Sequence, residues 1–197
     1  KGLSEAEIAI RLGIEGGRIE GWLLPDTYLF DKKSSDLELL ARAHQAMRNK
    51  LDLAWGERNA GLPYKSPYEA LIMASIVEKE TGDGNDRALV AAVFVNRLRK
   101  GMLLQTDPTI IYGLGETFDG NLRKTDLQTD TPYNTYIRGG LPPSPIAMPG
   151  LAAIQAALHP SASDALYFVA RGDGSSQFSR TLEEHNKAVR KFQKGGK

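Results

Sequence analysis

The segment EALIMASIVEKETG, residues 69–82, constrains the fold of this chain more than any other. Its residues 70–77 are apolar on every side of a helix, and a helix without a polar face has to be buried. Its start is marked by Ser66 as the cap, Pro67 at the first helical position and Glu69 at the third. Gly82 is the predicted stop. The sequence therefore predicts a helix that the rest of the chain must cover.

The remaining elements indicate an α+β fold. A second apolar helix at residues 88–101 must pack on the first or be covered by other elements. Capping boxes predict three further helix starts: Ser4 with Glu7, Ser35 with Glu38, and Thr181 with Glu184. A helix is expected between Pro149 and Pro160, and strands at 166–170 and around Phe178. Residues 101–148 are rich in Pro, Gly, Thr and Tyr, which predicts loops and short strands. We expect a helical layer, a small β-sheet and a long irregular segment that forms a cleft wall.

Two glutamates, Glu78 and Glu80, end the apolar helix with Lys79 between them. Each continues a face that is apolar one turn earlier: Leu71, Ala74 and Ser75 for Glu78, and Met73, Ile76 and Val77 for Glu80. One interpretation is that the helix emerges into water here. The other is catalytic, because the negative end of a helix and an apolar surround both raise a carboxyl pKa. A general acid has to stay protonated near neutral pH, so the residues leave both interpretations open.

Composition excludes several other classes of site. The 197 residues carry a formal net charge of +1, which gives no reason to expect a nucleic-acid partner. The absence of cysteine excludes disulfides, thiol catalysis and thiolate metal sites. The three histidines lie far apart in sequence, which argues against a histidine metal site or a Ser-His triad. No apolar run approaches the length of a membrane span. Because the chain begins at Lys1, we interpret it as a trimmed or mature fragment.

Polar side chains of the kind that bind carbohydrate gather in LQTDPT and TPYNTY, on backbone predicted to be irregular. Planar amides hydrogen-bond to sugar hydroxyls, and aromatic rings cover the apolar faces of sugars. The residues concerned are Gln105, Asp107, Tyr133, Asn134, Thr135 and Tyr136. The alternative is that the Thr, Asn and Asp side chains cap turns while the tyrosines fill the core.

Taken together, several long motifs resemble the YceG-like, or MltG, family of endolytic murein transglycosylases. They occur in this order: EGWLLPDTYLF, ASIVEKET, VFVNRL, MLLQTDPTIIYG, TPYNTYIRGGLPPSPIAMPG and ALHPSASDALYFVARGDGSSQFSRTLEEHNKAV. The resemblance covers about residue 20 to the C-terminus. It implies that residues 20–197 are the catalytic domain and residues 1–19 the remnant of an upstream LysM-like module. It also implies an N-terminal membrane anchor absent from this chain. The location would be the inner (cytoplasmic) membrane, with the catalytic domain facing the periplasm or cell exterior.

The resemblance further implies the reaction. The β-1,4 bond between N-acetylmuramic acid and N-acetylglucosamine is cleaved in nascent glycan strands, leaving a 1,6-anhydromuramyl end. The family's catalytic glutamate lies in ASIVEKET, and we carry it to Glu78, acting first as acid and then as base. Glu80 becomes a supporting residue, and Glu20 joins the six residues above as a substrate-binding candidate. Expected partners are peptidoglycan strands, the wall-synthesis machinery and, through the anchor, the membrane; nucleic acid, metal and cofactor are not expected.

Two alternatives stay open at this point. A non-catalytic glycan-binding module would use the same cleft and make no product. A muramidase-type hydrolase would use Glu78 as the acid and Glu20, Asp107 or Glu80 as a second carboxylate. The sequence also leaves the choice between Glu78 and Glu80 undecided.

Overall fold

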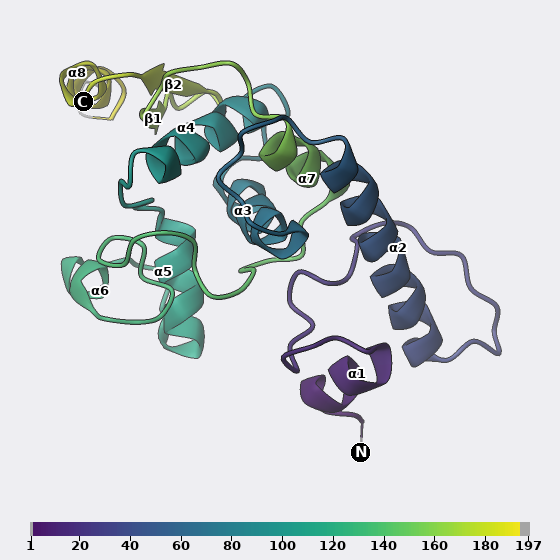
Figure 1. Cartoon of the computed structure of the whole chain (residues 1–197). Helices are drawn as coiled ribbons and strands as arrows, with labels where there is room; N and C mark the ends of the chain where they lie inside the picture. The colour runs from purple at the N-terminus through teal and green to yellow at the C-terminus, as the bar shows by residue number, and fades with distance from the viewer. Residues whose placement is uncertain (1, 194–197) are drawn as a thin grey trace.

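The computed structural model describes residues 2–193, which form helices and one two-stranded sheet (Figure 1). This confirms the expected α+β class. The elements are α1 (Glu5–Leu12), α2 (Asp36–Gly56), α3 (Pro67–Glu80), α4 (Arg87–Arg99), α5 (Asp107–Leu114), the 3-10 turn η1 (Gly115–Thr117), α6 (Lys124–Gln128), α7 (Leu151–Leu158), β1 (Tyr167–Ala170), β2 (Ser176–Ser179) and α8 (Leu182–Phe192).

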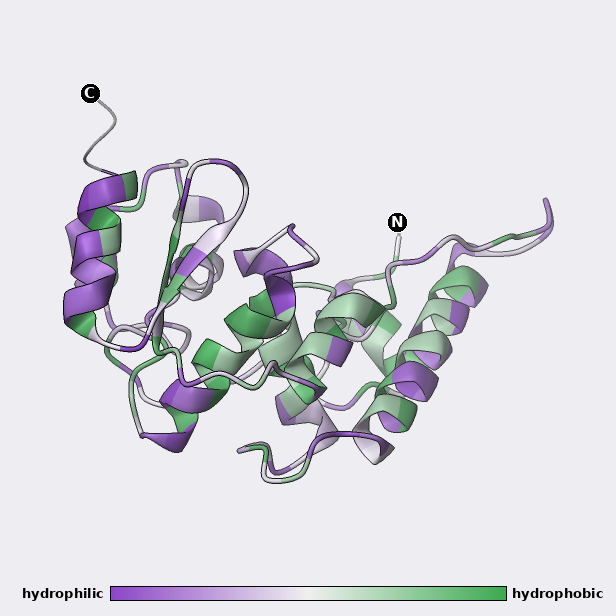
Figure 2. Ribbon diagram, turned by 90° about the horizontal axis from the view of Figure 1, so that it is seen from above, coloured by the Kyte–Doolittle hydropathy of each residue, from purple (hydrophilic) through white to green (hydrophobic). Residues whose placement is uncertain are grey.

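Helix α3 lies in the middle of the molecule, as its apolar surface predicts. Every residue from 70 to 77 is buried, and α7 is the main neighbour of α3, with α2, α4 and α5 also in contact (Figure 1). Figure 2 shows the apolar residues gathered on the central helices, whereas α8 at the C-terminal end is mostly hydrophilic. Within residues 2–193, no helix combines the length and the apolar character that crossing a membrane requires. The core is therefore built around one helix that ends on Glu78, Lys79 and Glu80.

The start of α3 follows the prediction, but its end does not. The Ser66 hydroxyl accepts a hydrogen bond from the Glu69 backbone N–H, and Pro67 occupies the first turn. At the other end, Gly82 is not left-handed. The helix stops because Thr81 turns to an extended conformation, with φ −145°, and its hydroxyl accepts the N–H of Asp83. The predicted glycine stop was therefore wrong, and a threonine performs that role.

The other helix starts and the strands are confirmed. All three predicted capping boxes form with reciprocal hydrogen bonds, at the starts of α1, α2 and α8. Strands β1 and β2 pair antiparallel in a register that places Phe168 opposite Phe178. Helix α8 packs against both strands. The hairpin and α8 thus form a small unit that joins the central helices through α4.

The segment 101–148 contains no strand, so the short strands predicted there were wrong. Its regular elements are the helices α5 and α6 and the turn η1. The β-branched pair Ile110–Ile111 and the neighbouring Gly113 resemble a strand in sequence, but Pro108 lies in the first turn of a helix and starts α5. Gly113 is required by packing, because an added Cβ would lie 2.8 Å from the Thr131 hydroxyl. The rest of the segment is irregular, as expected.

Candidate functional site

The C-terminal end of α3 opens onto a cavity of about 590 Å³. Glu80 forms part of its wall, with Arg97 from α4 and Gln105, Asp107 and Tyr136 from the segment 101–148. The hairpin and α8 close the opposite side with Tyr167, Phe168 and His185. The cavity therefore collects charged, amide and aromatic groups from four distant parts of the sequence.

Glu80 is the carboxyl group at this wall. Burial raises its pKa, and the nearby negative charge of Asp107 acts in the same direction. Two groups oppose this shift: the Thr106 hydroxyl, which donates a short hydrogen bond to Glu80 Oε1, and the positive charge of Arg97. A carboxyl group in this setting holds its proton above the usual pH range, and it has partners ready to stabilise the anion once the proton leaves.

Arg97 is a fixed positive charge beside Glu80. Its Nε donates to the carbonyl oxygen of Leu166 at 2.7 Å, and its Nη1 donates to that of Leu104 at 2.9 Å. Only 8% of the residue is exposed, and burial lowers its pKa while leaving it a strong base. Because backbone carbonyls rather than a carboxylate hold the guanidinium, no ion pair within residues 2–193 neutralises its charge.

Gln105 enters the cavity wall on strained backbone. Its φ is +50°, and within residues 2–193 Gln105 is the only residue other than glycine with a positive φ. This left-handed conformation costs about 1–2 kcal/mol for a side chain other than glycine. It is held by a hydrogen bond from the Gln105 N–H to the Thr135 carbonyl oxygen at 3.0 Å. Strain of this kind gathers at functional sites, where surrounding contacts enforce it.

Asp107 and Tyr136 form a second polar pair in the same wall. The Tyr136 hydroxyl donates to Asp107 Oδ1 at 2.5 Å. Burial raises the pKa of Tyr136, and the hydrogen bond to Asp107 raises it further, so the phenol stays protonated. Asp107 therefore faces the cavity, and the hydrogen bond from Tyr136 fixes the orientation of its side chain.

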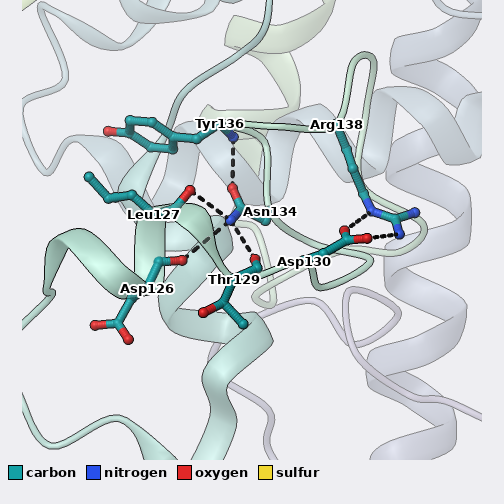
Figure 3. A network of polar contacts seen from close by, with 7 residues as sticks. All are labelled: Asp126, Leu127, Thr129, Asp130, Asn134, Tyr136 and Arg138. Atoms are coloured by element: carbon teal, nitrogen blue, oxygen red, sulfur yellow. Dashed lines mark hydrogen bonds and ion pairs between the residues drawn. The ribbon is translucent and has the colours of Figure 1, made fainter.

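Asn134 and Thr135 lie behind the wall and not on its surface. The Asn134 side chain is 1% exposed, and its amide donates to the carbonyl oxygens of Asp126, Leu127 and Thr129 (Figure 3). Its Oδ1 accepts the Tyr136 N–H at 2.9 Å (Figure 3). The Thr135 hydroxyl accepts the Thr106 N–H at 3.1 Å. Both residues position the groups that face Glu80.

Glu78 projects from a different face of α3. Its Oε2 accepts the Gly150 N–H at 3.0 Å, at the residue that caps the start of α7. A carboxylate at this position interacts favourably with the positive end of α7, by about 0.3–1 kcal/mol. Glu78 does not line the 590 Å³ cavity.

Glu20 and Tyr133 lie together in a third place, with Tyr112. Burial raises the pKa of Glu20, and the negative charge of Glu5 adds to the effect, while Arg18, Tyr112 and Lys79 act against it. The Tyr133 hydroxyl accepts from Arg18 Nη1 at 2.9 Å and is 2.6 Å from the Ser144 hydroxyl. The rings of Tyr112 and Tyr133 are 4.9 Å apart. Of the predicted residues, the structure thus brings Glu80, Gln105, Asp107 and Tyr136 to one cavity.

Sequence reasoning missed the polar residues Arg97, Thr106 and His185 of this site and the two rings of its wall, Tyr167 and Phe168. Arg97 continues the apolar face of Val90 and Val93, which is the same signal that singled out the glutamates. Thr106 stands between two predicted residues. His185 lies on α8 with a buried Nδ1 that has no partner among residues 2–193, and its ring stacks on Tyr167 at 5.3 Å. No local signal marks this histidine.

Comparison with known proteins shows which family the chain belongs to. A sequence model of the YceG-like family matches residues 3–191. The chain belongs to the YceG-like family. It is 42% identical over 174 residues to an endolytic murein transglycosylase of Bacillus subtilis and 35% identical over 178 residues to one of Streptococcus pneumoniae. These matches cover 88% and 87% of this chain, but only 48% and 32% of the relatives.

A solved YceG-like structure has the same fold. The crystal structure of a YceG-like protein from Listeria monocytogenes superimposes with a TM-score of 0.71 at 42% identity. The match covers 86% of this chain and 55% of that one. The chain thus spans about half the length of its YceG-like relatives from Bacillus and Listeria. The division predicted at residue 19 stays a prediction.

Thr106, which donates a hydrogen bond to the Glu80 carboxyl group, should set the pH range of any acid catalysis by Glu80. Replacing Thr106 by valine removes a hydrogen bond that lowers the Glu80 pKa, so this pKa rises. Since the acid works when protonated, activity falls as pH rises through its pKa. We therefore expect the alkaline limb of the kcat/KM profile to move to higher pH. Thr125→Val, at an exposed threonine of α6, is the control and should leave the profile unchanged. If the alkaline limb of the kcat/KM profile stays in place in both variants, Thr106 does not set the Glu80 pKa.

Proposed function

We propose that this chain is the catalytic domain of an endolytic murein transglycosylase, the activity that names its Bacillus and Streptococcus relatives. It cleaves the β-1,4 bond between N-acetylmuramic acid and N-acetylglucosamine and leaves a 1,6-anhydromuramyl end. The observation that carries the proposal is one buried carboxyl group with a raised pKa, Glu80, at the wall of a 590 Å³ cavity. A cavity of this volume is typical of small-molecule and carbohydrate subsites.

The acid in this proposal is Glu80, although the motif comparison first pointed to Glu78. Glu80 lines the cavity beside a fixed cation, whereas the Glu78 carboxylate is engaged with the start of α7. A general acid has to reach the glycosidic oxygen of a bound sugar. Glu80 meets that condition through the cavity it borders. Glu78 then becomes a structural residue that holds α7 against α3.

The reaction needs one carboxyl group in two roles. Protonated Glu80 donates its proton to the glycosidic oxygen as the C1–O bond of the muramyl residue breaks, which releases the 4-hydroxyl of N-acetylglucosamine. The Glu80 carboxylate then removes the proton of the muramyl 6-hydroxyl, and O6 forms the new bond to C1. No water is consumed, and Glu80 ends protonated. Because the attacking hydroxyl belongs to the same sugar, the step has the advantage of an intramolecular reaction.

The neighbours of Glu80 suit both halves of this cycle. Thr106 and Arg97 stabilise the carboxylate that exists between the two proton transfers. Asp107, held by Tyr136, offers negative charge to the positive charge that develops on the sugar ring as the bond breaks. Gln105 supplies an amide for sugar hydroxyls. In the proposed site, Thr106, Arg97 and Asp107 thus stabilise charge during the reaction, and Gln105 binds sugar hydroxyls.

One observation favours a second candidate, a muramidase-type hydrolase. Asp107 lines the same cavity as Glu80 and could act as the second carboxylate that hydrolysis requires. The two enzymes differ in the product, since hydrolysis places a water oxygen on C1 and leaves a reducing end. A non-catalytic glycan-binding module, the third candidate, would create no new ends.

The cellular setting follows from the substrate. Murein lies outside the cytoplasmic membrane, so the proposed activity places this domain on the periplasmic or outer side. We extend the proposal to an anchor in that membrane and to contact with the machinery that synthesises the strands. The support for this extension is the substrate named for the relatives.

The deciding experiment is mass spectrometry of glycan strands after incubation with the chain. An anhydromuramyl end is lighter than a hydrolysed end by one water, about 18 Da. Detection of anhydromuramyl ends supports the proposal. Reducing ends would replace it with the hydrolase and direct attention to Asp107. The absence of new ends, together with strand binding by the folded chain, would establish the binding module instead.

A further inference from the structure

A second cavity, of about 370 Å³, lies at the opposite end of α3 from Glu80. Ser66 and Tyr68 at the start of α3 border it, together with Trp22 and one face of α2. The 14 residues of α3 separate the two cavities by about 20 Å, at about 1.5 Å per residue. This second cavity takes no part in the proton transfers proposed for Glu80.

One wall of the second cavity is aromatic. The rings of Trp22 and Tyr68 stack with their centroids 5.6 Å apart and an interplanar angle of 12°. Both side chains are only partly buried, so the pair presents an apolar surface to the cavity. The parts of two offset-stacked rings that stay exposed can pack against the face of a sugar ring that carries its C–H bonds.

A buried histidine without a second partner borders the same cavity. His44 is 6% exposed, and its Nδ1 lies 3.0 Å from the Trp22 carbonyl oxygen. Because a carbonyl oxygen only accepts, Nδ1 is the donor, and in the neutral ring Nε2 is an acceptor. Within residues 2–193, Nε2 has no hydrogen-bond partner, and it is not among the fully buried polar atoms. It therefore offers a lone pair to a donor that enters the cavity.

Two charged residues continue the His44 face of α2. Arg48 and Asp52 follow His44 at intervals of four residues, which places all three on one side of the helix. Both charged side chains are exposed, and neither forms an ion pair within the described part of the chain. An acceptor, a multiple donor and a carboxylate thus line up beside the aromatic wall, where the His44 ring meets Trp22 edge-on with ring centroids 5.8 Å apart.

We propose that this second cavity binds an N-acetylated amino sugar. The ring packs on Trp22 and Tyr68, the acetamide N–H donates to His44 Nε2, and Arg48 and Asp52 bind the hydroxyls. The inference rests on the proposed function in one respect: it makes the cavity a remote subsite for the same glycan strand. Binding about 20 Å from the reacting bond would favour cleavage within long strands, since remote contacts contribute to transition-state binding.

The experiment uses the two tryptophans of the chain as reporters. We would titrate ¹⁵N-labelled Glu80→Gln protein, in which only slow cleavage is expected, with the tetrasaccharide of N-acetylglucosamine and follow both indole N–H signals. The Trp22 signal should shift in a saturable way. The Trp55 signal should not, because Trp55 does not line the cavity and the Arg58 guanidinium covers its ring at 3.9 Å from the ring centre. Cellotetraose lacks the acetamide and should bind about tenfold more weakly, as expected for one lost hydrogen bond.

Variants in the exposed part of the cavity give the matched comparison. Arg48→Ala and Asp52→Ala should each weaken binding about tenfold, and Lys50→Ala, on another face of α2, should not. A Trp22 signal that does not move, or that moves equally in all variants and with cellotetraose, would overturn the proposal. The result is separable from the proposed function, because strand cleavage without a Trp22 shift rejects this cavity alone. A Trp22 shift in a chain that makes no anhydro ends rejects the catalytic proposal alone.

Discussion

Glu80→Gln is expected to reduce the rate of anhydromuramyl formation by about 10²–10⁴-fold, the usual contribution of a general acid. Glutamine has the shape of glutamate and can still accept the Thr106 hydrogen bond, so the variant removes the proton while keeping the packing. The measurement is the initial rate of new anhydro ends, by mass spectrometry, at saturating strand concentration. Loss of kcat with little change in strand binding is the expected pattern.

Glu78→Gln is the matched control, two residues away on the same helix. Its amide oxygen can still accept the Gly150 N–H, so we expect activity within a few-fold of the parent chain. Stability should fall by at most about 1 kcal/mol, through the lost charge at the start of α7. The opposite outcome, an inactive but folded Glu78 variant beside an active Glu80 variant, would return the acid to Glu78 and leave the 590 Å³ cavity without its proposed role.

Thermal stability offers an independent check on Glu80. A carboxyl group whose pKa is raised by folding stabilises the protein while it is protonated, and that stabilisation is lost as pH rises through the folded-state pKa. Glutamine does not titrate. The Tm of the Glu80→Gln variant relative to the parent chain should therefore increase from acidic toward neutral pH. A constant difference would show that Glu80 titrates alike in the folded and unfolded states.

The second large effect is expected at Asn134. Asn134→Leu keeps the approximate size of the side chain but removes its donor to three carbonyl oxygens and its acceptor for the Tyr136 N–H. Leaving buried polar groups without partners costs about 1–3 kcal/mol each, and water will reach some of them, so we expect a loss of about 3 kcal/mol. For a chain of this length, that loss lowers the Tm by about 6–12 °C.

Activity should fall together with stability in this variant. Thr135 follows Asn134 and holds the Thr106 N–H and the strained Gln105, so a shifted segment would misplace both groups beside Glu80. Differential scanning calorimetry and the anhydro-end assay measure the two effects. Asn121→Leu, at an exposed position of the same segment, is the control. An Asn134 variant as stable as this control would mean that the network in Figure 3 does not hold the loop.

Local signals predicted most of the fold correctly. Capping boxes identify the starts of α1, α2 and α8 because both partners of the hydrogen bonds lie within four residues. The same locality explains the failure at 101–148. The Ile110–Ile111 pair favours a strand on intrinsic preference, but packing against α3 decides for helix α5.

The candidate site was predictable only in part, because its residues differ in how they act. Gln105, Asp107 and Tyr136 face the cavity, as their polar and aromatic side chains suggest. Asn134 and Thr135 carry similar polar side chains, but these bind backbone groups. No feature of the neighbouring sequence distinguishes residues that face the cavity from residues that bind the backbone. Arg97 and His185 come from elements that meet Glu80 only after folding.

By itself, the sequence determined that residues 70–77 form a buried helix and that this helix ends on two carboxylates, because apolar character on every side leaves no alternative. Only the tertiary structure gives those two carboxylates different surroundings. Glu78 and Glu80 are about 200° apart around the helix axis, and each continues an equally apolar face. The start of α7 meets one face, while Thr106 and Arg97 meet the other. The proposed choice of Glu80 over Glu78 therefore depends on contacts between residues far apart in the chain, which no pattern within α3 contains.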